Sequence, residues 1–275
     1  MKILLTTALT SAFLLLGTAK AHALVLYNGS LGTSPNSQGW TRNFLTGPTV
    51  TVNSSGTTLN TTSNDSLVAG YGRTVTMDRN TGYNLMFRIQ LNSENHDNPN
   101  AQNNTGTDTI ADRAGLSVAV LSSTDARGIE LGFWTNRIWA QEDGAVKADP
   151  VNAPTGTRFT QAEGVSFNTQ AAAVQYDLSV LGNTYYLYAG GSYAAPILTG
   201  RLRDYTLEGF PYTSAGSIGI GDNTSSARGS FRLEQVELTN SAIVPVPFAF
   251  NPLFGFGLFG ISRIRKAIKA RQSAN

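Results

Sequence analysis

Apolar residues in the central part of the chain recur in short runs with a period of two, the spacing of β-strands with one buried face. Leu85, Phe87 and Ile89, for example, are separated by Met86 and Arg88. No long segment keeps apolar residues at the helical period, and glycine, asparagine, serine and proline separate the runs. The pattern predicts strands over residues 24–27, 49–52, 67–76, 83–91, 116–121, 128–134, 137–141, 174–180, 184–188, 218–221 and 230–238.

So many short strands within about 215 residues predict an all-β fold, a two-sheet antiparallel sandwich of the jelly-roll type. Gly182 and Asn183 stand between two predicted strands and tolerate positive φ, so a tight hairpin is expected there. Residues 92–112 are rich in asparagine and predict one long polar loop, in which His96 is expected to face solvent. No repeat of 20–50 residues is visible, which argues against a solenoid or a propeller.

The start of the chain has the features of a secretory signal peptide. Lys2 precedes an apolar run over residues 3–16, and Ala21-His22-Ala23 supplies small residues for cleavage after Ala23, with Ala21 as the alternative. The run is shorter than the roughly 20 residues that span a bilayer, which argues against a membrane helix. The predicted organisation is a signal peptide over 1–23, a β-sandwich over 24–240 and a sorting or membrane-anchor segment over 241–275.

The last 32 residues, 244–275, predict an attachment to the membrane. They contain, in order, the motif Val244-Pro245-Val246-Pro247-Phe248, an apolar helix predicted over about 248–262, and a basic tail over 263–271 that includes Arg263, Arg265 and Lys266. The apolar run over 248–261 has fourteen residues and in helical form would cover about 21 Å of the roughly 30 Å of hydrocarbon. A transmembrane helix with its basic tail in the cytoplasm and an interfacial amphipathic helix therefore both remain open.

The combination of this tail with a signal peptide resembles bacterial PEP-CTERM sorting tails, and its motif is similar to the VPxP and Pro-Phe-Glu variants of cyanobacteria. The resemblance implies an exosortase-type enzyme as a partner that recognises the tail and often removes it. The acidic residue that usually follows the proline is absent, because Val246 follows Pro245 and Ala249 follows Phe248. Permanent anchoring and cleavage both stay open.

The body of the chain resembles the choice-of-anchor Y family of secreted bacterial proteins. The segments that carry the resemblance are 26–33, 112–115, 127–134, 137–141, 162–165, 202–205 and 221–227, which include Asp112-Arg113-Ala114-Gly115 and Gly221-Asp222-Asn223-Thr224. The resemblance implies an extracellular domain carried by interchangeable anchors, and it implies no established activity. The architecture is also similar to concanavalin A-like lectins and glucanases, an analogy of fold alone.

Composition and charge exclude several classes of functional site and of binding partner. The absence of cysteine excludes disulfides, thiolate metal sites and a cysteine nucleophile, and two histidines leave little room for a zinc site or a histidine-based triad. Seven of the 20 basic residues lie at the two ends, so residues 24–240 hold 13 basic against all 18 acidic residues, a net charge of −5. A mildly acidic domain lacks the basic face that nucleic acids need, so no nucleic-acid partner is expected.

The richest candidate site lies between Glu130 and Asp143. If 128–134 is a strand, Ile129, Leu131 and Phe133 face the core, and the other face presents a carboxylate and an indole. Aromatic planes beside charged and amide groups are typical of saccharide sites. The predicted ligand-binding residues are Glu130, Trp134, Arg137 and Trp139. The alternative is that both tryptophans fill the core and that Glu130 pairs with an arginine.

Catalysis and metal binding have weaker support in the sequence. A glycosidase needs two carboxylates about 5–10 Å apart, and Glu130, Glu142 and Glu163 are the candidates, but the E-x-D-x-x-E pattern of sandwich glucanases is absent. No catalytic residue is therefore assigned, and no cofactor is expected. Calcium remains an option, because it binds hard oxygen ligands of the kind that a polar loop supplies. Its weak candidates, which a solvated loop would equally explain, are Asp97, Asp108, Asp112 and Asp222.

Together these features predict an exported, non-catalytic β-sandwich that is anchored at the cell envelope or released from it. Its expected role is that of a surface or extracellular-matrix binding module, with extracellular polysaccharide as the ligand. The alternatives are a glycan-active enzyme of the sandwich type and a purely structural surface protein.

Overall fold

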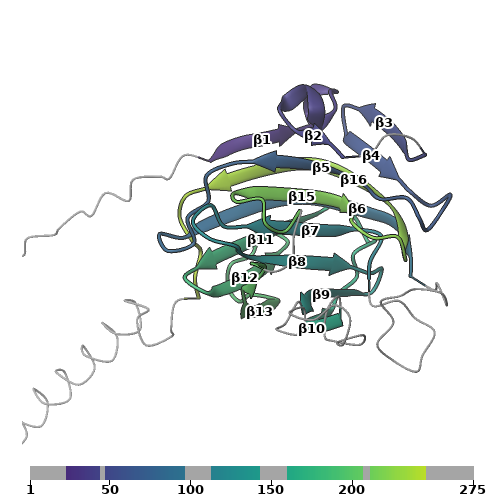
Figure 1. The fold of residues 1–275 in the computed structure, drawn as a ribbon. Helices are drawn as coiled ribbons and strands as arrows, with labels where there is room; N and C mark the ends of the chain where they lie inside the picture. Colours follow the sequence, from purple (N-terminus) through teal and green to yellow (C-terminus); the bar gives the residue numbers. More distant parts are fainter. Residues whose placement is uncertain (1–22, 44–46, 97–112, 143–159, 207–210, 246–275) are drawn as a thin grey trace, which may run out of the picture.

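The computed structural model describes residues 23–43, 47–96, 113–142, 160–206 and 211–245. These residues form two antiparallel β-sheets that pack face to face as a sandwich (Figure 1). The first strand begins at Leu24 and the last ends at Thr239. Two 3₁₀ turns, η1 (Gly29–Leu31) and η2 (Pro35–Gln38), follow β1, and the described residues include no helix that could cross a membrane.

The first sheet, sheet A, has the long strands β6 and β16 at its centre. Its order is β13-β12-β11-β6-β16-β4-β3, and β1 also pairs with β16. Its strands are β1 (Leu24–Asn28), β3 (Thr49–Asn53), β4 (Gly56–Asn60), β6 (Tyr83–Asn95), β11 (Val174–Leu181), β12 (Thr184–Ala189), β13 (Leu198–Arg201) and β16 (Arg228–Thr239).

The second sheet, sheet B, is also antiparallel throughout. Its order is β10-β9-β8-β7-β15-β5-β2, and β14 also pairs with β8. Its strands are β2 (Thr41–Arg42), β5 (Ala69–Thr74), β7 (Ser117–Leu121), β8 (Arg127–Phe133), β9 (Arg137–Glu142), β10 (Thr160–Ser166), β14 (Arg203–Asp204) and β15 (Ser217–Asp222).

The predicted all-β sandwich of two antiparallel sheets is confirmed, and each predicted strand is present with bounds shifted by a few residues. The strands that the pattern missed are β2, β4, β10, β13 and β14. They are short or polar, with few apolar residues to establish an alternation. The hairpin at Gly182 and Asn183 is confirmed, since it joins β11 to β12 and Gly182 has a φ of +61°.

The core lies between the two sheets and consists of the inward residues of each alternating strand. Sheet A contributes Leu85, Phe87 and Tyr176, and sheet B contributes Ile129 and Phe133, all buried. The rings of Phe87, Phe133 and Tyr176 contact one another with centroids 5.3–6.1 Å apart. This confirms the expected inward face of β8 and leaves the alternate residues of each sheet on its outer face.

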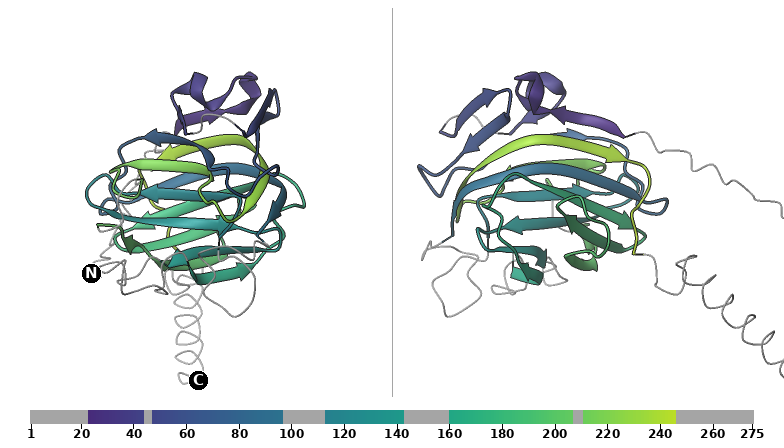
Figure 2. Two further views of the ribbon diagram at one scale, coloured as in Figure 1. Left: turned by 45° about the vertical axis from the view of Figure 1, so that its right-hand side comes forward. Right: turned by 180° about the vertical axis from the view of Figure 1, so that it is seen from behind.

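The central pair β6 and β16 is long and strongly curved (Figure 2). The register between them shifts at Ser230/Phe231 and at Leu233/Gln235, and such bulges bend a strand and increase its twist. The pairing continues to Asn95, opposite Arg228. The prediction of a loop from residue 92 is therefore wrong at its start: residues 92–95 belong to β6, because β16 supplies hydrogen-bond partners that the polar sequence alone does not reveal.

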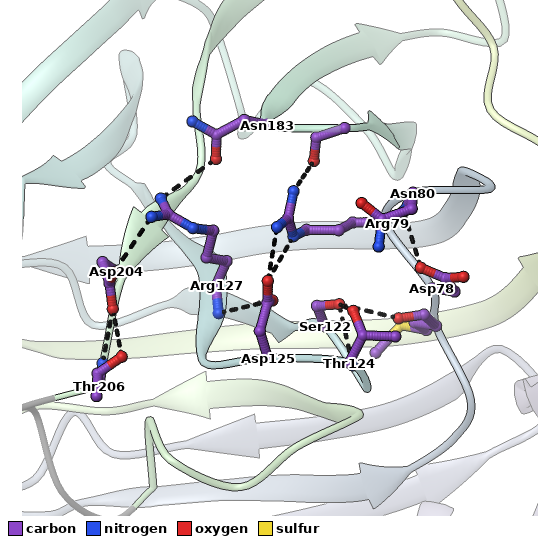
Figure 3. A network of polar contacts seen from close by, with 12 residues as sticks. Asp78, Arg79, Asn80, Ser122, Thr124, Asp125, Arg127, Asn183, Asp204 and Thr206 are labelled. Atoms are coloured by element: carbon purple, nitrogen blue, oxygen red, sulfur yellow. Dashed lines mark hydrogen bonds and ion pairs between the residues drawn. The ribbon is translucent and has the colours of Figure 1, made fainter.

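A network of ion pairs and hydrogen bonds connects the two sheets at one end of the sandwich (Figure 3). Arg79, in the turn before β6, donates from Nε and Nη2 to Asp125 Oδ2 at 2.9 and 2.6 Å, and Asp125 lies in the turn between β7 and β8. This hydrogen-bonded pair holds the pKa of Asp125 below its usual range. Arg127 donates to Asn183 at 3.5 Å and to Asp204 at 3.2 Å, so the β11–β12 hairpin joins the same network.

Candidate functional site

The outer face of sheet B carries two rows of small residues that run across the strands. In one row the register places Gly72, Gly219 and Ala119 side by side, followed by Glu130 on β8. The parallel row contains Gly70, Gly221, Ser117, Gly132 and then Trp139 on β9. Cross-strand partners point to the same side of a sheet. The middle of this face is therefore nearly free of side chains.

A cavity of about 290 Å³ lies over these rows. We call it the glycine groove and define it by its floor residues Gly72, Ala119 and Gly219 and its wall residues Tyr212 and Asn223. The exposed Val68 and Pro211 add apolar surface to its lining, and Thr41 and Asn43 add polar groups.

Glycine is present in these two rows for different physical reasons. A Cβ at Gly70 would lie 2.8 Å from the Ile220 carbonyl oxygen, so close strand packing requires a glycine there. A Cβ at Gly219 would meet only the Ala119 Cβ, at 3.8 Å, and the φ of Gly219 is not positive. Neither packing nor backbone conformation requires glycine at 219. Its effect is a flat floor that lets a ligand approach the backbone.

Glu130 lies beside the groove with 2% of its surface exposed. Its carboxylate accepts hydrogen bonds from the Tyr212 hydroxyl, from Asn223 Nδ2 at 3.3 Å and from Gln141 Nε2 at 3.2 Å. Arg113 Nη2 lies 3.5 Å from its Oε1 and completes a buried ion pair. Glu130 therefore fixes Tyr212 and Asn223, the two side chains that form the wall of the groove.

The other predicted ligand-binding residues lie away from the groove lining. Trp139 is buried, and its ring packs on Gly132, where a Cβ would lie 2.5 Å from Cζ2. Trp134 is half-buried, packs edge-on against Trp139 and donates from Nε1 to the Arg113 carbonyl at 2.8 Å. Arg137 packs against Gly164. The structure thus brings Glu130 together with Arg113 rather than with Arg137.

His96 is not a solvent-facing loop residue. Its ring stacks on Trp134 with centroids 3.9 Å apart and planes 3° apart, and Nδ1 lies 2.8 Å from Glu94 Oε2. The expectation was wrong because β6 extends to Asn95 and carries His96 to the end of β8.

Of the four weak calcium candidates, the structure describes Asp222 alone. Asp97, Asp108 and Asp112 lie outside the described residues. Asp222 is buried, accepts from Thr61 Oγ1 at 2.5 Å and from the Thr224 amide at 3.3 Å. Among residues that the structure describes, no group of three or more histidine or acidic side chains could hold a metal ion.

Burial raises the pKa of Asp222 to about 8, partly offset by the hydrogen bond from Thr61 and by the Arg113 charge, with Glu94 acting in the opposite direction. Since the ordinary value is 3.8, the native protein holds this proton between pH 4 and 8 while the unfolded chain releases it. The unfolding free energy should therefore fall as the pH rises through that window, by up to about 1.4 kcal/mol per unit.

We expect Asp222→Asn to remove this contribution, because the amide does not titrate and its oxygen can still accept the hydrogen bond from Thr61. Urea unfolding at intervals from pH 5 to 8 measures it. Asp204→Asn is the control: hydrogen bonds from Thr206 lower the pKa of Asp204, so its effect on stability falls at acidic pH. Equal slopes for wild type and Asp222→Asn over this window would contradict the assignment.

No protein-family model and no curated protein matches this chain. Solved structures do match it. A carbohydrate esterase from the Shiga toxin-encoding bacteriophage phi24B is 10% identical with a TM-score of 0.50, over 80% of this chain and 100% of that one. A Bacillus subtilis protein of unknown function with a galectin-like fold is 9% identical with a TM-score of 0.44, over 80% and 97%. The carbohydrate recognition domain of Emp46p is 10% identical with a TM-score of 0.42, over 80% and 97%. At these identities the likeness concerns the fold alone.

The sequence pattern did not mark the groove residues Gly72, Gly219 and Tyr212 as a site. A signal for the floor was nevertheless present. In Ser217-Ile218-Gly219-Ile220-Gly221 apolar residues alternate with glycine, and 69–72 repeats the pattern. Such an alternation predicts a strand that buries one face and carries no side chains on the other. Tyr212 and Asn223 come from loops, and no periodic pattern in the sequence predicts where loop residues lie.

Proposed function

We propose that this protein is an exported, non-catalytic β-sandwich that binds a neutral extracellular polysaccharide in the glycine groove. The observation that carries the proposal is the flat floor at Gly219 beside a wall that Glu130 holds in place. The two-sheet sandwich is compatible with the jelly-roll, concanavalin A-like arrangement that the sequence suggests. A solved structure of this fold at 10% identity is a carbohydrate esterase.

The chemistry of the groove fits a sugar ring. Sugars present apolar C–H faces and hydroxyl groups, and sites for them combine flat apolar surface with a few oriented polar groups. The floor supplies the flat surface, and Asn223 and Tyr212 supply oriented polar groups. Asp222, which also lines the groove, is uncharged below about pH 8 because burial raises its pKa. Arg73 also lines the groove, but its guanidinium donates to the Leu26 and Gln38 carbonyls, so the lining favours a neutral saccharide over an acidic one.

The hydrogen bonding of Glu130 argues for binding without catalysis. A glycosidase acid must reach the glycosidic oxygen, and a second carboxylate must lie about 5–10 Å away across the substrate. Glu130 is buried, and four donors from the protein already occupy its two oxygens. Glu163, another candidate acid, is paired with Arg203 at 2.5 Å, and this hydrogen-bonded pair counteracts its burial and keeps the pKa of Glu163 low.

The proposal of export and anchoring is based on the sequences of the two ends of the chain. Residues 1–23 have the composition of a signal peptide, and 248–271 that of an apolar segment with a basic end. The motif over 244–248 begins a few residues after β16, and its first two residues, Val244 and Pro245, are exposed. An exosortase-type enzyme could therefore reach the start of the motif. The rest of the tail lies outside the described residues.

The test of the groove uses Gly219→Leu in the full-length protein, kept in a detergent without a sugar head group such as lauryldimethylamine oxide. The leucine Cβ would meet only the Ala119 Cβ, at 3.8 Å, and the rest of the side chain would occupy space in the groove. In calorimetric titrations with neutral hexasaccharides of glucose or mannose, we expect Gly219→Leu to remove one binding site per chain. Gly219→Ala, the matched control, should weaken that site by a smaller factor.

Unchanged binding by a folded Gly219→Leu variant would contradict the proposal. The same titrations, analysed for released oligosaccharides or acyl groups, decide between a binding module and a glycan-active enzyme. Product release that Gly219→Leu abolishes would favour the enzyme. Products that match a protein-free control would support the binding module.

A further inference from the structure

A second cavity, of about 450 Å³, lies on the opposite face of the sandwich, over the outer surface of sheet A. We call it the sheet A cavity; its lining includes Asn84, Met86, Gln175, Asp177, Tyr193 and Glu237. The register places Asp177, Met86 and Glu237 side by side across β11, β6 and β16. Leu85 and Phe87, which alternate with Met86, face the core, so this row points outward.

Asp177 organises the sheet A cavity in the way that Glu130 organises the glycine groove. It is 1% exposed and accepts from Asn84 Nδ2 at 3.0 Å and from Gln175 Nε2 at 2.8 Å. The Tyr193 hydroxyl is also hydrogen-bonded to it, and burial together with the nearby Asp177 charge raises the pKa of Tyr193. One buried carboxylate thus fixes three side chains that line the cavity.

Asn84 has an unmet hydrogen-bonding requirement. Its side chain is 5% exposed, and its Oδ1 has no partner within the described part of the chain, while its Nδ2 is committed to Asp177. A buried acceptor without a donor costs free energy, and a hydroxyl group in the cavity would satisfy it. The ligand that this atom selects is therefore a hydrogen-bond donor.

Tyr193 supplies the second element of recognition. It is 45% exposed although its hydroxyl is hydrogen-bonded to Asp177. Tyr188 packs edge-on against it with centroids 5.6 Å apart. An exposed aromatic ring beside fixed amide and carboxylate oxygens offers an apolar plane for C–H groups and acceptors for hydroxyls.

We propose that the sheet A cavity is a second saccharide site, in which a neutral sugar stacks on Tyr193 and donates a hydroxyl to Asn84 Oδ1. The carboxylates of Asp177 and Glu237 line the same cavity and repel acidic sugars. This site does not depend on the glycine groove. Two sites on opposite faces make each chain bivalent, so a polysaccharide network would be cross-linked rather than only bound.

The test uses the full-length protein in lauryldimethylamine oxide and four variants: Tyr193→Ala, Gly219→Leu, the double variant, and Leu31→Ala as a control. Leu31 is exposed and lies in neither cavity, so its truncation matches that of Tyr193 in exposure. The probes are laminarihexaose, maltohexaose, cellohexaose and mannohexaose for calorimetry, the corresponding polymers for turbidity, and oligoguluronate as the acidic sugar.

We expect two sites in wild type and in Leu31→Ala, one in each single variant, and none in the double variant. Only the two-site proteins should make the polymer solution turbid. If the Tyr193→Ala variant still has both sites, with affinities within twofold of wild type, the proposal is overturned. Tight binding of oligoguluronate by the Gly219→Leu variant, which keeps only the sheet A cavity, also overturns it. If Gly219→Leu has no effect and Tyr193→Ala removes all binding, the groove is refuted and this site stands. Absence of binding by wild type to every probe overturns both.

Discussion

Glu130→Ala is expected to lower the unfolding free energy by about 3–5 kcal/mol, among the largest effects of any single change in this protein. The substitution removes the common acceptor of Tyr212, Asn223 and Gln141 and leaves the buried Arg113 without this carboxylate. Buried donors that lose their acceptor retain the full cost of desolvation. Urea or thermal unfolding of the purified protein measures the change.

Glu130→Gln is the matched control. The remaining carbonyl oxygen of the glutamine still accepts a hydrogen bond, but its NH2 group faces other hydrogen-bond donors. We therefore expect the unfolding free energy to fall by an intermediate amount, about 1–3 kcal/mol. Where this variant folds, binding in the glycine groove should weaken, because Tyr212 and Asn223 lose part of their anchorage. A catalytic acid would behave differently: the Gln variant would lose turnover and keep substrate binding. If Glu130→Ala were as stable as wild type, Glu130 would not be the residue that holds the wall of the groove in place.

The two cavities share one design. In each, a buried carboxylate on an outer sheet face accepts hydrogen bonds from side chains that come from different strands or loops. Neither Glu130 nor Asp177 needs to contact a ligand to determine the shape of its cavity. Each substitution at these positions therefore requires a measurement of folding beside the measurement of binding.

The fold was largely predictable because the sandwich buries one face of most strands. Alternation such as that of Leu85, Phe87 and Ile89 is a direct consequence of that burial. Two of the strands that escaped prediction, β2 and β14, consist of two residues each and form because a neighbouring strand supplies the partners. The extension of β6 to Asn95 has the same cause, because β16 pairs with it.

The candidate site was predictable only in part. The sequence led to Glu130 because a carboxylate within an apolar strand is conspicuous. Glu130 is not part of the groove lining, but it is hydrogen-bonded to the wall residues Tyr212 and Asn223. It did not identify Arg113 as the partner, since Arg113 precedes β7 and Glu130 lies in β8, and only the fold brings the two side chains together. Glycines were interpreted as separators between strands, although alternate glycines within β5 and β15 create the floor of the groove. A missing side chain is a weaker signal than an unusual one.

Gly115→Ala should destabilise the protein by about 3 kcal/mol, at the upper end of the usual cost of overpacking. Gly115 precedes β7 of sheet B, and Gly229 lies in β16 of sheet A; their backbones touch where the two sheets meet. A Cβ at Gly115 would lie 2.5 Å from the Gly229 nitrogen and closer still to the Arg228 carbonyl. The obstruction is backbone, which cannot rotate away as a side chain would.

Two other glycines isolate this cause. Gly182 has a φ of +61° and no atom within 4 Å of an added Cβ, so Gly182→Ala tests conformational strain alone, with an expected loss of about 1 kcal/mol. Gly219 has neither constraint, so Gly219→Ala should leave stability unchanged within about 0.5 kcal/mol. Thermal unfolding of the three variants should give this order. If Gly115→Ala were as stable as Gly219→Ala, the contact between the sheets would be looser than described. The order as expected would show that glycine serves packing at 115, conformation at 182 and an open binding surface at 219.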